Sequence, residues 1–117
     1  MDFDFDAVQR QIRETFARFC DERVVPRAAA LDAAHAFPRE LFDELAALGL
    51  FGMRYPEDVG GSGMQLIEFC LALEAIARGS MSLAGCAAMQ SLMGTKFLHM
   101  LGNADIVERL FKPALRG

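Results

Sequence analysis

Apolar residues recur three and four positions apart along most of the chain, and no stretch keeps the strict alternation of a half-buried strand. This pattern predicts an all-α fold, a five- to six-helix up-and-down bundle that forms one domain over residues 1–117. The expected helices cover roughly residues 6–34, 38–48, 65–78, 80–101 and 103–112.

Proline and glycine set the ends of the first two helices. Pro26 has no amide hydrogen to donate, so it should kink or split the first helix near Val24 and Val25. Pro38 suits the first position of the second helix, and Gly49 fits the left-handed residue that commonly ends one. The following segment, residues 50–63, contains one proline and three glycines and is expected to be an ordered loop.

The later helices have polar caps. Ser80 or Ser82 is expected to cap a fourth helix that runs unbroken to Gly102. A short fifth helix should begin after Asn103 and end at Pro113, because proline cannot continue the hydrogen-bond ladder.

The third and fourth helices are unusually apolar. The third has apolar side chains nearly all round, with Leu66 and Cys70 on its main inward face, which places it at the centre of the bundle. The fourth has a face of large side chains that we expect in the core: Leu83, Cys86, Met89, Met93, Phe97, Met100 and Leu101.

A stripe of small side chains lies on another side of the fourth helix, formed by Ala84, Ala88, Ser91 and Thr95 and continued by His99. Small residues let two helices approach closely, so the stripe can be a packing surface. It can equally be one wall of a deep slot that accepts an apolar ligand such as an acyl chain. Spacing does not choose between these two interpretations.

Charge is distributed unevenly along the chain. Residues 1–58 carry 12 acidic and 7 basic side chains, whereas residues 59–117 carry only 4 and 5. Surface helices need a polar face, so the second half should be covered on more than one side. A domain this small cannot supply all of that cover, which predicts a further covering partner over the third and fourth helices.

Composition excludes several classes of protein. A net charge of −4 with no basic cluster argues against nucleic-acid binding, and the uncharged run 79–95 is too short and too polar to span a membrane. The acidic N-terminus does not resemble a secretory leader. Three cysteines without CxxC spacing indicate buried thiols in a reducing compartment, so we expect a cytoplasmic protein.

Other candidate sites are weak. Glu74 and Arg78 are spaced for a structural ion pair, and His35 and His99 have no partner at the spacing of metal ligands. The Gly-Gly-Ser-Gly segment at residues 60–63 lacks the strand and Lys-Ser/Thr context of a phosphate loop. We therefore expect this chain to contain no catalytic, metal-binding or cofactor-binding residue.

Residues 24–64, "VVPRAAALDAAHAFPRELFDELAALGLFGMRYPEDVGGSGM", closely resemble the amino-terminal helical domain of the acyl-CoA dehydrogenases. The segments "LEAIARGSMS" (73–82) and "GNADIVERLFKPALRG" (102–117) resemble later parts of the same domain. The resemblance covers residues 6–117, and the Pro-Glu-x-x-Gly-Gly-x-Gly loop at residues 56–63 is its most specific part.

The resemblance implies a flavoprotein oxidoreductase of three domains, in which FAD and the acyl-CoA or acyl-carrier-protein thioester lie between the domains. The base, a glutamate, and the flavin contacts belong to the β-domain and C-terminal helical domain, which would follow Gly117. The family places part of the acyl-chain pocket on the helix that matches residues 82–99. The substrate-binding candidates are Leu83, Ala84, Ala87, Ala88 and Ser91.

The leading hypothesis is therefore the N-terminal domain of an FAD-dependent acyl-CoA dehydrogenase, inactive by itself and unable to bind FAD alone. Small residues from Ala84 to Ala88 suggest a roomy slot for medium, long or branched acyl groups. Two alternatives stay open: a stand-alone helical interaction module, and a separate subunit that completes a flavoprotein partner. Exposed apolar surface would also favour a homo-oligomer.

Overall fold

The structure is a computed structural model that describes residues 3–117, and helices make up its regular secondary structure throughout that range, with no strand. The predicted all-α up-and-down bundle is confirmed. In chain order the helical elements are α1 (Ala7–Phe19), η1 (Cys20–Val24), α2 (Val25–Ala34), α3 (Arg39–Ala47), η2 (Glu57–Val59), α4 (Leu66–Ala77), α5 (Met81–Leu92), α6 (Gly94–Leu101), α7 (Ala104–Ile106), η3 (Val107–Phe111) and α8 (Lys112–Ala114).

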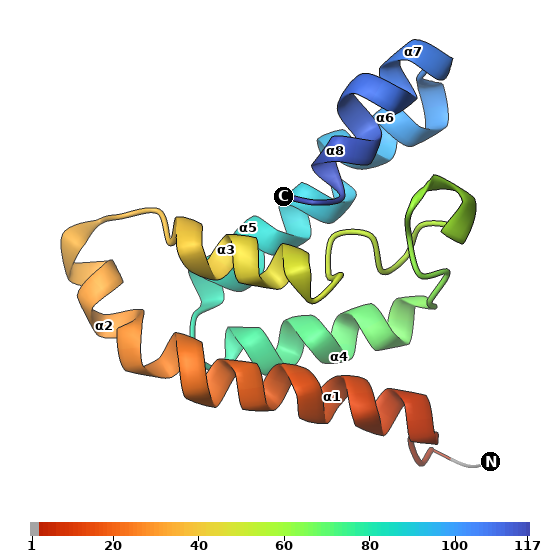
Figure 1. The fold of residues 1–117 in the computed structure, drawn as a ribbon. Helices are drawn as coiled ribbons and strands as arrows, with labels where there is room; N and C mark the ends of the chain where they lie inside the picture. Colours follow the sequence, from red (N-terminus) through yellow and green to blue (C-terminus); the bar gives the residue numbers. More distant parts are fainter. Residues whose placement is uncertain (1–2) are drawn as a thin grey trace.

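The bundle is built around α4, which contacts α1 on one side and α5 on another, while α3 packs against α5. Figure 1 shows α6, α7 and α8 projecting from this body as a short arm. The described residues measure 44 × 41 × 19 Å, and their radius of gyration is 14.8 Å. A compact domain of this length would have about 13 Å. The molecule is therefore a slab about two helices thick with a large surface.

The first helix begins with a reciprocal cap and widens before its proline. The Asp6 side chain accepts from the Gln9 amide at 2.8 Å, and the Gln9 side chain accepts from the Asp6 amide at 3.1 Å. The helix widens into a π turn at Cys20–Val24, immediately before the turn that contains Pro26. This wider turn removes the need for the hydrogen bond that proline cannot donate, so the chain stays helical into α2 and the predicted kink or split is not a break in the helix.

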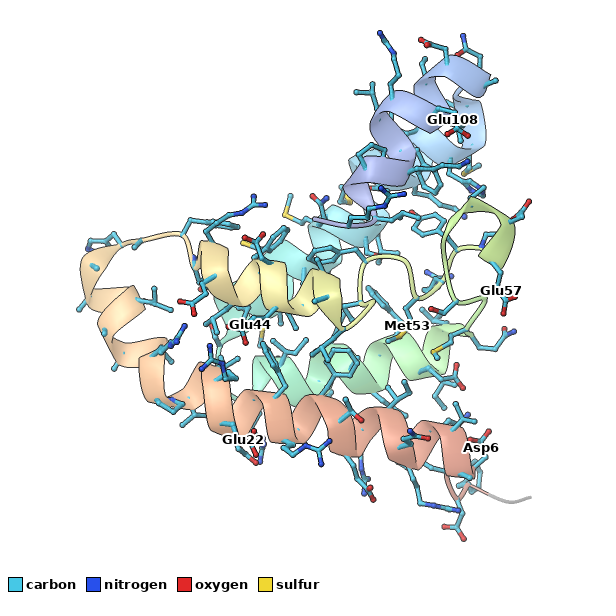
Figure 2. All side chains as sticks on the ribbon, in the orientation of Figure 1. Asp6, Glu22, Glu44, Met53, Glu57 and Glu108 are labelled. Atoms are coloured by element: carbon cyan, nitrogen blue, oxygen red, sulfur yellow. The ribbon has the colours of Figure 1, made fainter. Side chains whose placement is uncertain are left out.

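The predicted ordered loop is confirmed, and it contributes to the core. Gly49 has φ = 81° and ends α3. The loop folds back on itself through backbone hydrogen bonds such as Met64 N to Met53 O at 2.9 Å. Met53 lies between the loop and α4 (Figure 2), and its side chain is buried. Leu50, Phe51 and Tyr55 are buried as well, so the loop is an integral wall of the fold.

The later part of the chain differs from the prediction in two places. The expected fourth helix is broken at Met93, whose φ of −77° and ψ of −96° are not helical, and α6 restarts at Gly94. The last helix does not end at Pro113. A second π turn, Val107–Phe111, precedes the proline and lets the chain stay helical to Ala114. The physical reason is the one that applies at Pro26.

The prediction that the large side chains of residues 83–101 fill the core is wrong for most of them. Leu83 is buried and Cys86 is half-buried, but the remaining five are exposed, among them Met89 at 61%, Phe97 at 62% and Leu101 at 79%. On α4, Leu66 and Cys70 are likewise exposed rather than inward. The buried stripe is the one of small residues. These exposed apolar side chains lie on α4, α5 and α6, which agrees with the prediction that the third and fourth helices lack cover.

Ion pairs join η1 and α2 to other elements. Arg23 binds Glu44 through two nitrogens, Nε to Oε2 at 2.9 Å and a terminal nitrogen to Oε1 at 2.7 Å. Glu44 lies on the side of α3 that faces the first helix (Figure 2). This hydrogen-bonded guanidinium lowers the pKa of Glu44. The predicted pair of Glu74 with Arg78 is replaced by Arg78 with Asp21 at 2.6 Å, because η1 lies within reach of Arg78.

Candidate functional site

Helix α5 carries the five residues that the sequence singles out for substrate binding. Leu83, Ala84, Ala87 and Ser91 are buried inside the described domain, and Ala88 is half-buried. The first four therefore share one face, the face turned toward α3, α4 and the loop. Ala88 alone reaches the surface. Inside the described domain, Ala84, Ala87 and Ser91 therefore serve as close-packing residues, which is the first of the two interpretations of the small side chains.

Two hydrogen bonds fix the orientation of α5. The Ser91 hydroxyl donates to the Phe51 carbonyl at 3.1 Å, and the Tyr55 hydroxyl donates to the Ser91 carbonyl at 2.5 Å. Both partners lie on the loop that precedes α4. The helix is therefore held against the loop by polar contacts, and this determines which face of α5 is left toward solvent.

The solvent-facing side of α5 consists of small or apolar side chains. Met81, Gly85 and Met89 are exposed, while Cys86, Ala88 and Leu92 are half-buried. A methyl group built on Gly85 would meet nothing within 4 Å, so open space lies directly above this position. Sequence reasoning placed Met89 in the core and gave no direction for Gly85, because the orientation of both depends on the Tyr55 and Ser91 contacts.

Grooves border α5 at both ends. One of about 330 Å³ lies between α2, α3 and the start of α5 and is lined by Leu31, Leu41 and Leu83 with Asp32 and His35. Another of about 420 Å³ runs along the later part of α5, where Phe37 and Phe42 face Cys86, Met89 and Met93. The largely apolar lining of the second groove suits the non-polar part of a ligand, whereas the first groove has a mixed lining.

One buried carboxylate was not foreseen. Glu68, in the first turn of α4, is 7% exposed, and its Oε1 accepts from Gln9 Nε2 at 3.1 Å. Gln9 thus caps α1 and binds the start of α4 at once. The other carboxylate oxygen of Glu68 is buried without a hydrogen-bond partner among residues 3–117. A single glutamate in an apolar run gave no signal for this contact, which joins residues 59 positions apart.

His99, the second candidate that lacked a metal-like spacing, lies in a small aromatic cluster. Its ring stacks on Phe111 with centroids 4.9 Å apart and meets the edge of Tyr55 at 5.3 Å. This cluster attaches the arm to the loop. Within residues 3–117 no group of three or more His, Cys, Asp or Glu side chains is placed to hold a metal ion.

The family of this chain is decided by comparing its sequence with models of protein families. The family model described as "Acyl-CoA dehydrogenase, N-terminal domain" matches residues 6–117. The chain belongs to the acyl-CoA dehydrogenase family. Its resemblance to that family, which rested on the residue 24–64 motifs, is thereby confirmed.

Individual acyl-CoA dehydrogenases agree in sequence and fold. The benzylmalonyl-CoA dehydrogenase of Aromatoleum aromaticum is 76% identical over 117 residues, which are 100% of this chain and 31% of that enzyme. A glutaryl-CoA dehydrogenase solved with glutaryl-CoA matches with a TM-score of 0.92 at 26% identity, over 99% of this chain and 30% of the other. The acyl-CoA dehydrogenase of Bacillus anthracis, solved with FAD, matches with a TM-score of 0.85 at 25% identity, over 97% of this chain and 19% of the other.

The chain therefore spans about a third of the length of its acyl-CoA dehydrogenase relatives. The two grooves beside α5 are open to solvent, whereas a bound cofactor or ligand is normally buried over most of its surface. The described residues therefore do not by themselves enclose a ligand.

The described residues contain no helix with the length and apolar character needed to cross a bilayer.

Proposed function

We propose that this chain is the N-terminal helical domain of an FAD-dependent acyl-CoA dehydrogenase, an oxidoreductase that introduces an α,β double bond into an acyl thioester. The observation that carries the proposal is the 76% identity to benzylmalonyl-CoA dehydrogenase over the whole chain, combined with coverage of only 31% of that enzyme. FAD, the base and the domains that follow would come from the remainder of the protein.

The role of this domain in the proposed enzyme is to supply one wall of the acyl pocket through α5. The five residues Leu83, Ala84, Ala87, Ala88 and Ser91 remain a prediction for that wall. We place the acyl group on the solvent-facing side of the helix, against Gly85, Ala88 and Met89. Of the five predicted residues, only Ala88 lies on this side. Open space above Gly85 and the small side chain of Ala88 support this placement, because they leave room for a bulky tail.

The proposed substrate is a CoA thioester with a medium, branched or aryl-bearing acyl group. The similarity to a benzylmalonyl-CoA dehydrogenase supports the aryl form in particular. A preference for C4 over C8 and longer thioesters would contradict this proposal. The acyl-carrier-protein thioester is the alternative carrier, and nothing on α5 favours it.

Exposed apolar side chains support the proposal that other protein covers this domain. They lie on α4, with Leu66 at 54%, and on α5 and α6, with Phe97 at 62%. We propose that the β-domain and C-terminal helical domain of the same enzyme cover them, in a homo-oligomer located in the cytoplasm. The three free cysteines, of which Cys20 is fully buried, are consistent with a reducing compartment.

A domain exchange tests the function directly. Residues 1–117 would replace the matching 117 residues of the A. aromaticum enzyme. We expect the chimera to bind FAD and to oxidise benzylmalonyl-CoA with kcat/KM within about tenfold of the parent, since a misfit worth 1.4 kcal/mol costs a factor of ten. A folded chimera without flavin would contradict the proposal and favour the stand-alone interaction module.

The separate-subunit alternative has its own test. The chain and the remaining two thirds of the A. aromaticum enzyme would be produced as two polypeptides and mixed. Recovery of FAD binding and activity on mixing would show that the domain can act as a subunit, whereas activity confined to the fused chimera would exclude it.

A further inference from the structure

The solvent-facing side of α5 carries no charged side chain of its own. From Gly79 to Thr95 the sequence contains no Asp, Glu, Lys, Arg or His. The polar side chains in the later part of α5 are already engaged: Gln90 donates to the Ala114 carbonyl at 2.8 Å, and Ser91 donates to the Phe51 carbonyl at 3.1 Å. The surface from Gly85 to Leu92 therefore has no free polar side chain directed to a ligand.

The cations that flank α5 along the chain are committed elsewhere. Arg78, before the helix, binds the Asp21 carboxylate at 2.6 Å and the Ala17 carbonyl at 3.4 Å. Lys96, after the helix, places its ammonium 5.7 Å from the centre of the Tyr55 ring. Neither side chain is available to pair with a ligand lying on Gly85 and Met89.

Arg39 is the cation next to the groove along the later part of α5. It lies over the Phe42 ring at 5.7 Å and binds Asp43 at 2.7 Å. A carboxylate placed on the exposed side of α5 would lose water without gaining a counter-ion or a hydrogen-bond donor from this wall. Such a buried, unpaired charge is strongly unfavourable.

We infer that the α5 wall selects acyl groups whose tail is uncharged, and that it excludes thioesters with a carboxylate at the far end of the tail. This inference rests on the proposed function, which places the acyl group on α5. It assigns Met89, exposed and central on that surface, as a residue that determines specificity. The inference does not apply to a carboxylate next to the thioester, because α5 is proposed to contact only the tail of the acyl group.

An isosteric pair of thioesters tests the inference in the chimeric holoenzyme. 3-(4-Nitrophenyl)propanoyl-CoA and 3-(4-carboxyphenyl)propanoyl-CoA have tails of nearly equal size and differ in charge. Their inhibition constants would be measured against oxidation of benzylmalonyl-CoA. We expect the nitro compound to bind at least about a hundredfold more tightly, because the charged tail is desolvated without a partner.

A charge introduced at Met89 provides the matched variant. Met89→Lys should lower the preference for the nitro compound by at least about tenfold, since an opposite charge compensates the buried carboxylate. Val8→Lys adds the same charge on the exposed side of α1 and should leave the preference unchanged. Both positions are exposed, so neither lysine disturbs the core.

The outcomes separate the two proposals. If the chimera holds FAD and oxidises benzylmalonyl-CoA but binds both tails equally, the charge-selective wall is wrong and the proposed function stands. Equal effects of Met89→Lys and Val8→Lys would overturn the role of Met89. A folded chimera that lacks flavin overturns both the proposed function and this inference.

Discussion

The Tyr55 hydroxyl donates a hydrogen bond of 2.5 Å to the backbone carbonyl of Ser91, from a side chain that is almost fully buried. The Ser91 hydroxyl returns a bond of 3.1 Å to Phe51 on the same loop. These two hydrogen bonds hold α5 against the loop. They turn Ala84, Ala87 and Ser91 inward and leave the opposite side of the helix to solvent.

Tyr55→Phe should lower the free energy of unfolding by about 1–2 kcal/mol, because it removes the bond to Ser91 and retains the ring. Tyr55→Leu should cost more, since the ring also packs on Phe111 with centroids 5.0 Å apart. Urea unfolding followed by circular dichroism measures both values. A Tyr55→Phe variant as stable as the original chain would show that the bond does not hold α5.

The same tyrosine predicts a loss of stability in alkali. Burial raises the pKa of Tyr55 above the ordinary value of 10.0. The folded state therefore favours the neutral phenol, and its stabilising contribution is present below pH 10 and lost as the pH rises through the raised pKa. Thermal unfolding from pH 8 to 11.5 should show a fall above pH 10 that is smaller in Tyr55→Phe. Parallel curves for the two proteins would refute this origin.

Two glycines should respond oppositely to alanine. A methyl group on Gly61 would lie 2.0 Å from the Tyr55 carbonyl oxygen and 2.6 Å from that of Gly52, so Gly61→Ala should cost about 3 kcal/mol or more. Gly85, in α5, has open space around it, and Gly85→Ala should stabilise the helix by about 0.5–1 kcal/mol. Chemical denaturation of both variants checks the pair, and a destabilised Gly85→Ala would mean that this surface is covered in the isolated chain.

The apolar surface of α6 should make the isolated chain self-associate. Phe97 and Leu101 are 62% and 79% exposed and lie one turn apart. Light scattering should show mass increasing with concentration, and the double variant Phe97→Ser with Leu101→Ser should restore a monomer. Val8→Ser removes an exposed apolar side chain from α1 and serves as the control. A clean monomer of the unmodified chain at high concentration would contradict this prediction.

Helical spacing and capping residues predict most of the elements of this fold. Asp6, Gly49 and Asn103 lie at the ends predicted for them, because caps and left-handed residues act locally. Pro113 misleads, since a π turn upstream lets the helix pass through it. Phe111, the last residue of that turn, packs against Tyr55, a contact that no local pattern reveals.

The orientation of α5 and α6 was the harder prediction. Large apolar side chains at helical spacing favour a core assignment, yet Met89 and Phe97 are exposed and Ala87 is fully buried. The contacts that decide the orientation run from side chains to the backbone, as from Tyr55 to Ser91. Because every residue has a backbone carbonyl, the sequence does not show which carbonyl will accept such a bond. The links Gln9 to Glu68 and Arg78 to Asp21 escaped for a related reason: their partners are 59 and 57 positions apart.

The flavin content of the purified chimera with A. aromaticum benzylmalonyl-CoA dehydrogenase tests the central claim most directly. If residues 1–117 are the N-terminal domain of such an enzyme, the chimera should contain about one FAD per protomer, and its flavin absorbance should bleach when benzylmalonyl-CoA is added. A folded chimera that contains no FAD, or whose flavin is unchanged by the thioester, would contradict the account.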